Sequence, residues 1–177
     1  MQGVRKHLIV ARHLEDTSWV DLIDGWEPLV VTKGQDMPNE GREASSYFWA
    51  IHRLYPHLEP DSQVACLQGH PFDHCADLVE QLAQPAGSFR ALGWWDVKCG
   101  PDGAPHHPGL DLDPCYRRWV GGTPPTVYEF VAGAQFMVPG HLILRRPDNY
   151  WRNMVKRMTG NGPWVMERLW PYVFAEG

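Results

Sequence analysis

A chain of 177 residues, of which 44% are hydrophobic and 21% are charged, has the length and composition of one globular domain spanning residues 1–177. This composition excludes a disordered chain, and no apolar run approaches the ~20 residues of a membrane span, so we expect no membrane partner. The formal net charge is −5, but six basic residues stand against three acidic ones from Gly140 onward, and we expect this basic part to face an anion.

Three short apolar segments in the first half of the chain predict buried strands that end in polar residues. They cover residues 6–13, 27–34 and 63–69. The first follows the N-terminus without the apolar core of a signal peptide, so we expect a cytoplasmic protein. Apolar side chains then recur at three- and four-residue intervals from Ala44 to Tyr55 and predict an amphipathic helix, with Asn39 as its cap and Pro56 as its end.

The second half of the chain is predicted to be less regular. A helix is expected over residues 77–84, and the glycine- and proline-rich residues 85–125 predict a long loop that covers a site. Two further strands and two further helices are expected over residues 127–131, 134–138, 148–158 and 164–174. The four cysteines form no C-x-x-C pair, so we expect free thiols, with two disulfides as the alternative.

This order of elements predicts an α/β fold in which helices flank a mostly parallel central sheet. Ligand-binding groups collect at the carboxyl ends of the strands in such a sheet. Nine tryptophans exceed what a core of this size needs, so we expect some of them to line a groove. Polar residues stand in five clusters, several of them directly after predicted strands.

The first cluster follows the first strand and contains Arg12, Glu15 and Asp16. An arginine can bind a diphosphate here, and a carboxylate can accept hydrogen bonds from a ribose or a base. The alternative is a solvated turn in which an acid caps the next helix.

The second cluster contains Lys33 at the end of the second strand, together with Asn39, Arg42 and Glu43 before the amphipathic helix. A polar loop that leads into a helix N-terminus is a natural anion site. The alternative is a capped helix start with a local pair between the arginine and the glutamate.

The third cluster contains Gln68, His70, Asp73 and His74, directly after the third strand. Two imidazoles and a carboxylate within five positions could bind a divalent cation. Further candidate ligands downstream are His106, His107, Asp111 and Asp113. The alternative is that the histidines hydrogen-bond across the loop and bind no ion.

The last two clusters lie toward the C-terminus. Gly133 stands next to a predicted strand and close to Gln135, where it permits close approach of a ligand or forms a bulge. Glu167 lies in the last predicted helix, where a partly buried carboxylate is a candidate general base that activates a hydroxyl. The alternative is an ion pair between Glu167 and either Arg168 or Arg152.

Six motifs, which span nearly the whole chain, resemble the fingerprint of a domain-of-unknown-function family. They are Val10-Ala11-Arg12, Glu15-Asp16-Thr17-Ser18-Trp19, Asn39 to Glu43, Gln68-Gly69-His70, Gly133 to Phe136, and Glu167-Arg168-Leu169-Trp170. That family is similar in layout to compact glycosyltransferases of the A-type fold, in which the first strands hold the nucleotide, an acidic D-x-D turn holds a divalent metal, and a late helix supplies a carboxylate. The resemblance implies a sugar-nucleotide site at this sheet edge, although the turn here carries Asp73 in place of D-x-D.

The leading hypothesis is a glycosyltransferase that moves a sugar from a nucleotide-sugar donor, such as a UDP-sugar, to a hydroxyl acceptor, with modified bases in DNA as one candidate. In this hypothesis Arg12 and Lys33 face the diphosphate. Asp73 with His70 or His74 binds Mn²⁺ or Mg²⁺, and Glu167 accepts the acceptor's proton. The residues predicted to bind the nucleotide sugar are Arg12, Glu15, Asp16, Lys33, Asn39, Arg42, Glu43, Gln68 and Gln135.

Two alternative functions stay open at this point. A nucleic-acid-binding module would use the aromatic and basic residues 150–157 for stacking and phosphate contacts. A metal-dependent hydrolase would need the cluster from His70 to His74 to converge with His106 or His107. The sequence leaves the sugar, the acceptor and the oligomeric state undetermined.

Overall fold

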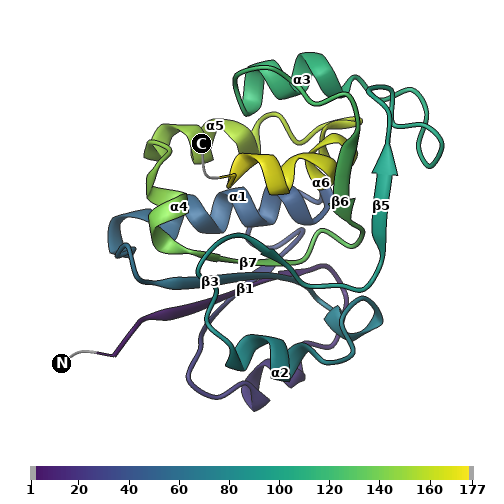
Figure 1. The fold of residues 1–177 in the computed structure, drawn as a ribbon. Coiled ribbons are helices and arrows are strands. Elements are labelled where there is room, and N and C mark those ends of the chain that lie inside the picture. Colours follow the sequence, from purple (N-terminus) through teal and green to yellow (C-terminus); the bar gives the residue numbers. More distant parts are fainter. Residues whose placement is uncertain (1–2, 176–177) are drawn as a thin grey trace.

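The computed structural model describes residues 3–175 as layers of helices on a central sheet (Figure 1). The sheet has five strands in the order β2-β1-β3-β7-β4. They are β1 (Lys6–Arg12), β2 (Glu27–Thr32), β3 (Gln63–Gln68), β4 (Arg90–Ala91) and β7 (Phe136–Pro139). β1 pairs in parallel with β2 and β3, whereas β7 is antiparallel to both of its neighbours, β3 and β4. Four strands therefore run in one direction, as the sequence predicts for a mostly parallel sheet.

The helices lie on the two faces of this sheet (Figure 1). The face with most of the helices carries α1 (Arg42–Leu54), α3 (Leu112–Trp119), α4 (Gly140–Leu144), α5 (Asp148–Val155) and α6 (Gly162–Val173), and the other face carries α2 (Leu78–Ala83) and a 3₁₀ helix (Ser18–Leu22). A separate antiparallel pair, β5 (Asp96–Cys99) and β6 (Tyr128–Val131), stands beside α6. The predicted α/β fold with flanking helices is confirmed.

The interior strand β1 is apolar from Leu8 to Ala11, because both of its faces are covered there. Leu8 and Val10 pack into the cluster that includes Leu78 of α2, while Ile9 packs into the opposite cluster with Ile51 of α1. Alternate side chains of a strand point to opposite faces, so a continuous apolar run is what burial on both sides requires. Polar side chains are thereby restricted to the ends of the strand.

An aromatic layer joins α1, α5 and α6 to β7. The Trp170 ring lies 4.8 Å from both Phe48 and Phe136, measured between centroids, and Trp151 stacks on Phe174 at 5.8 Å. Aromatic rings in such offset and edge contacts contribute more than their buried area alone. This layer holds α6, and with it Glu167, at a defined height above the sheet.

The predicted cap of the amphipathic helix is wrong, whereas its predicted end before Pro56 is confirmed. The residue before α1 is Gly41, in the left-handed region with φ 75°, and no side chain caps the helix, so Asn39 is not its cap. The α-helix ends at Leu54, and a 3₁₀ turn over Tyr55–His57 carries the chain through Pro56. A proline is tolerated at the first positions of a helical turn because its missing N–H has no intrahelical partner there.

Residues 85–125 contain more regular structure than the sequence indicates, namely β4, β5 and α3. The short helix α4 was not predicted either. Elements of two to eight residues span too few turns or alternations to show a period. All four cysteines are free, as expected, and no helix within residues 3–175 is long and apolar enough to cross a membrane.

Candidate functional site

The carboxyl ends of β1 and β2 open into a cavity of about 250 Å³, which we call the sheet-edge cavity. Its lining residues are Ala11, Arg12, His13, Glu15, Lys33, Asn39, Arg42 and Glu43. Six of the nine residues predicted to bind a nucleotide sugar are in this list. The first two polar clusters, which are separated along the chain by residues 17–32, are therefore parts of one site.

Arg12 and Glu15 are held in the cavity by the turn after β1. Arg12 donates a hydrogen bond from Nε to the Glu15 carbonyl oxygen at 3.0 Å, and its two Nη groups make no hydrogen bond within residues 3–175. The Glu15 carboxylate accepts hydrogen bonds from the backbone N–H groups of His13 at 2.6 Å and Leu14 at 3.1 Å. Burial raises the pKa of Glu15, but these N–H groups outweigh it, so the pKa is lowered. Glu15 is therefore a fixed anion beside an arginine with free donors.

Gly69 allows Glu15 to take this position. A Cβ atom at Gly69 would lie 2.8 Å from Oε2 of Glu15, which is closer than side-chain carbons come. The carbonyl oxygen of Gly69 also accepts a hydrogen bond from the indole of Trp19 at 2.8 Å. The Gln68-Gly69 motif thus brings the end of β3 against the turn after β1.

Lys33 is buried, and its ammonium group is committed to the protein. Its Nζ donates hydrogen bonds to the backbone oxygen of Glu40 and to Oγ of Ser45, and 7% of the residue is exposed. Burial lowers the pKa of Lys33 to about 8. The lysine therefore secures the loop before α1 while it lines the cavity wall.

The start of α1 places Arg42 and Glu43 where the cavity is open. Gly41 and Arg42 both have positive φ, at 75° and 48°, which turns the chain sharply before the helix. The Arg42 guanidinium lies 4.3 Å from the centre of the Trp164 ring and 3.4 Å from the Glu43 carboxylate. The local arginine–glutamate pair considered from the sequence is present, and both of its side chains face the cavity.

A second, smaller cavity adjoins the first, because Arg42 and Glu43 line both. Glu167 and Gln68 line this inner cavity. The Glu167 carboxylate accepts hydrogen bonds from the Gly133 N–H at 3.0 Å and from Nη1 of Arg168 at 2.8 Å. Its side chain remains 17% exposed. The pair with Arg168 therefore exists as one of the sequence alternatives, and it fixes the carboxylate in place without closing it off.

Two glutamines join the end of β3 to the turn between β6 and β7. The Gln68 amide donates to the Gly133 carbonyl oxygen at 2.6 Å, and the Gln68 N–H donates to the side-chain oxygen of Gln135 at 3.1 Å. The Gln135 amide in turn donates to the Pro71 carbonyl oxygen at 3.1 Å. Gln135 is only 3% exposed, so its amide is occupied in shaping the site.

The third cluster does not assemble into a metal site. The exposed side chains of His70 and Asp73 pair at 3.2 Å across the 3₁₀ turn over Pro71–Asp73, and the ring of His74 lies against Gly133. Within residues 3–175 no group of three or more His, Cys, Asp or Glu side chains could hold a metal ion. A resident Mn²⁺ or Mg²⁺ does not fit this donor set, and Asp73 is not among the residues that line the two cavities.

The downstream ligand candidates are also engaged elsewhere. His106 packs edge-on to Trp95 and His107 to Trp164, while Asp113 accepts a hydrogen bond from the Tyr128 hydroxyl at 2.8 Å. The convergence that a metal-dependent hydrolase requires is therefore missing from the described part of the chain. Asp16, which was predicted to bind the nucleotide, is exposed and does not line the two cavities. Its carboxylate accepts a hydrogen bond from the Ser18 N–H at 2.9 Å.

The basic C-terminal part does not supply the cations of the site. Arg145 and Arg146 donate hydrogen bonds to backbone carbonyl oxygens, including those of Ala175 and Val173. Arg168 is buried and pairs with Glu167. In the segment considered for stacking on nucleic acid, the Trp151 ring is fully buried in the core. The cations that face open space at the sheet edge instead come from the first quarter of the chain.

Sequence reasoning missed a third, larger cavity beyond Glu167. Its lining includes Phe89, Asp96, Phe130 and Pro171. A loop covering a site was expected in residues 85–125, but the residues singled out there, from His106 to Asp113, do not line this cavity. Trp164 carried a signal, since excess tryptophan predicted a groove, and it lines the inner cavity.

Comparison of this chain with models of protein families, with curated proteins and with solved structures found no match. The fold and the site define a class, namely an α/β protein with a charged cavity at the carboxyl ends of its parallel strands.

Gly133 is the residue whose backbone the site requires most strictly. Gly133→Ala should lower the free energy of unfolding by about 1–3 kcal/mol from its φ of 107° alone, and more because a Cβ would lie 2.8 Å from the His74 ring. Chemical denaturation measures this change. Gly87→Ala, at an exposed position with open space around it, is the matched control and should have little effect. Equal effects at the two positions would contradict this role of Gly133.

Lys33 should make stability depend on pH. Its pKa falls from an ordinary 10.5 to about 8 in the folded protein, so the unfolded chain binds the proton more tightly and the folded state gains stability as pH rises from about 8 to 10.5. The free energy of unfolding of the wild type, minus that of Lys33→Met, should therefore increase between pH 7 and pH 10. Denaturation at a series of pH values tests this, and a flat or falling difference would contradict it.

Proposed function

We propose that this chain is a glycosyltransferase that moves a sugar from a nucleotide-sugar donor to a hydroxyl acceptor. The observation that carries the proposal is the adjoining pair of cavities, one lined by Arg12, Lys33 and Arg42 and the other by Glu167. Such a transfer needs cations where a diphosphate leaves and a base where a hydroxyl attacks. Both kinds of group lie side by side at the edge where α/β sheets bind ligands, which supports the proposal.

The donor is proposed to lie in the sheet-edge cavity. The free Nη groups of Arg12 and the guanidinium of Arg42 are the groups suited to the diphosphate, because arginine binds phosphate oxygens through paired N–H donors. The carboxylates of Glu15 and Glu43 can accept hydrogen bonds from ribose hydroxyls or a base edge. Lys33 adds positive charge from the wall, although its hydrogen bonds are already directed to Glu40 and Ser45.

Glu167 is proposed as the general base. Each of its carboxylate oxygens accepts one hydrogen bond from the protein and keeps a further lone pair for the acceptor hydroxyl. In the proposed step the hydroxyl oxygen attacks the anomeric carbon and its proton passes to Glu167. The bond between that carbon and the diphosphate oxygen breaks, and the electron pair leaves with the diphosphate, where the arginines stabilise the developing charge.

No step is assigned to a metal ion, because His70 and Asp73 provide two neighbouring ligand groups and a third is missing within residues 3–175. The proposal therefore relies on arginine side chains for the charge that a divalent ion supplies in other transferases. A nucleic-acid-binding module has less support, since the ring of Trp151 that it would use for stacking is buried.

Nucleotide sugars should raise the melting temperature of the protein, since a ligand that binds only the folded state stabilises it. A panel of UDP-, GDP-, ADP- and dTDP-sugars, each with and without Mn²⁺, identifies the base of the donor. Arg12→Gln should weaken binding of that donor about tenfold or more, because a hydrogen bond to a charged group contributes about 1.5–3 kcal/mol.

Arg152→Gln is the matched control for Arg12, because Arg152 is exposed on α5 and does not line the cavities. It should leave the shift in melting temperature unchanged. If no member of the panel stabilises the wild type, or if both variants respond equally, the donor site is not where we propose it.

Glu167→Gln should lower the rate of sugar transfer by about 10²- to 10⁴-fold, because glutamine has no basic oxygen to take the proton. Release of free nucleoside diphosphate from the identified donor, with water or an added hydroxyl compound as acceptor, measures this rate. Donor-induced stabilisation should persist, since the arginines are intact. Glu80→Gln on the exposed side of α2 serves as the control, and an undiminished rate in Glu167→Gln would exclude the base role.

A further inference from the structure

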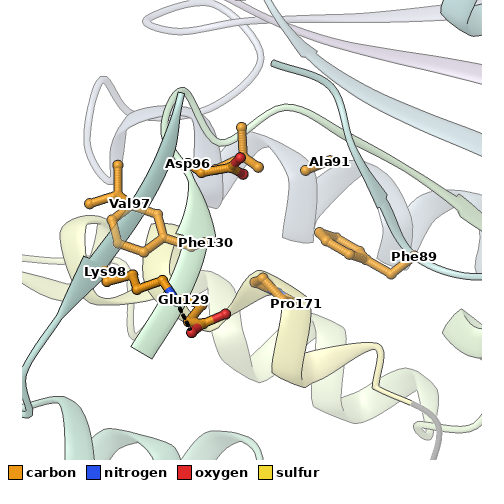
Figure 2. A pocket seen from close by; sticks show the side chains of 9 residues that line it. Phe89, Ala91, Asp96, Val97, Lys98, Glu129, Phe130 and Pro171 are labelled. Carbon is orange, nitrogen blue, oxygen red and sulfur yellow. Dashed lines mark hydrogen bonds and ion pairs between the residues drawn. The ribbon is translucent and has the colours of Figure 1, made fainter. Parts of the chain in front are cut away.

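A cavity of about 490 Å³ lies beyond Glu167, between the antiparallel β5–β6 pair, β4 and α6. Figure 2 shows Phe130 on the side of the β5–β6 pair and Phe89 on the opposite side, with Pro171 of α6 at the base. We call it the β5–β6 cleft. Its volume is in the range of small-molecule sites, which bury a ligand between apolar walls and a few polar groups.

The β5–β6 cleft leads toward the proposed base. A narrow cavity next to it is lined by Phe89, Ala91, Val131 and Pro171, which also line the cleft, and by Glu167. Pro171 is one turn after Glu167 on α6, so the two side chains lie along the same face of the helix. Glu167 thus lies between the sheet-edge cavity and the β5–β6 cleft.

The polar groups of the cleft are mainly acceptors. Lys98 and Glu129 face each other across the β5–β6 pair and form an ion pair at 2.6 Å. The carboxylate of Asp96 makes no hydrogen bond or ion pair within residues 3–175, although the charge of Lys98 attracts it at longer range. It extends toward the space between β5 and Ala91 (Figure 2). The oxygens of this carboxylate are therefore open to a ligand above an apolar floor.

We infer that the β5–β6 cleft binds the acceptor of the transfer reaction, and that this acceptor is an uncharged saccharide. The inference rests on the proposed function. A pyranose ring has an apolar C–H face, which fits the aromatic and proline floor, and an edge of hydroxyl donors, which fits the free carboxylate of Asp96. An anionic acceptor such as DNA would meet a carboxylate and no free cation here, so the charge favours a neutral sugar over a nucleic acid.

Saturation-transfer NMR with maltose, cellobiose, lactose and N,N′-diacetylchitobiose tests the inference on the full chain. At least one of these saccharides should bind, and its dissociation constant should rise about fivefold or more in Asp96→Asn, where the carboxylate charge is lost. Phe89→Leu, which keeps an apolar side chain but removes the ring, should weaken binding as well. Asp61→Asn, at an exposed turn before β3, is the control and should bind like the wild type.

Circular dichroism and the melting temperature verify that each variant is folded. The inference is overturned if none of the saccharides binds to the wild type, or if binding is the same in Asp96→Asn as in Asp61→Asn. It is also overturned if the single-stranded oligonucleotide dT8 binds and displaces the saccharide.

Failure of this inference is distinguishable from failure of the proposed function. Stabilisation by a nucleotide sugar without saccharide binding would leave the donor site standing and remove the acceptor assignment. Saccharide binding that depends on Asp96, without stabilisation by any nucleotide sugar, would show a saccharide site in the β5–β6 cleft. It would also contradict the proposal that the protein is a glycosyltransferase.

Discussion

The backbone of Gly133 holds the site together, because three separate parts of the chain contact it. Its N–H donates to the Glu167 carboxylate of α6, its carbonyl oxygen accepts from the Gln68 amide at the end of β3, and its Cα packs against the ring of His74. The backbone angle that makes this arrangement possible, φ 107°, is open to glycine and strained for other residues. One residue therefore sets the position of the proposed base relative to the parallel strands.

The positions of the charges follow from how the sheet is buried. β1 is covered on both faces, so its polar neighbours can only appear where the strand ends, and the same holds for β3. Fixing charges at such an edge requires partners for them, and the protein supplies these from backbone groups. Glu15 binds two N–H groups, and the Lys33 ammonium binds a carbonyl oxygen and a hydroxyl. Arg12 uses only its Nε in this way, which leaves its outer donors for a ligand.

Much of the fold and a good part of the site could be predicted from the sequence. The strands β1 and β3 are continuous apolar runs and α1 has a clear helical period. The carboxyl-end rule then brings the clusters around Arg12 and Lys33 together without any knowledge of contacts. The capping role of Asn39 was wrong because a glycine in the left-handed region, which has no side-chain signature beyond its own identity, starts the helix. Whether His70, Asp73 and His74 point to a common centre depends on side-chain directions in a loop, which spacing does not determine.

The β5–β6 cleft illustrates a different limit of prediction. Its walls come from β4, the β5–β6 pair and α6, so its aromatic side chains are more than 40 positions apart in the sequence and no motif connects them. The spatial order is nevertheless informative: a cavity with free arginine donors, then a fixed carboxylate, then a cleft with an apolar floor and an unpaired carboxylate. A diphosphate would be favoured at the first and disfavoured at the last, because the sign of the local charge reverses between them. The same reversal would orient a donor with its sugar toward Glu167, so charge placement alone could give the proposed reaction its direction.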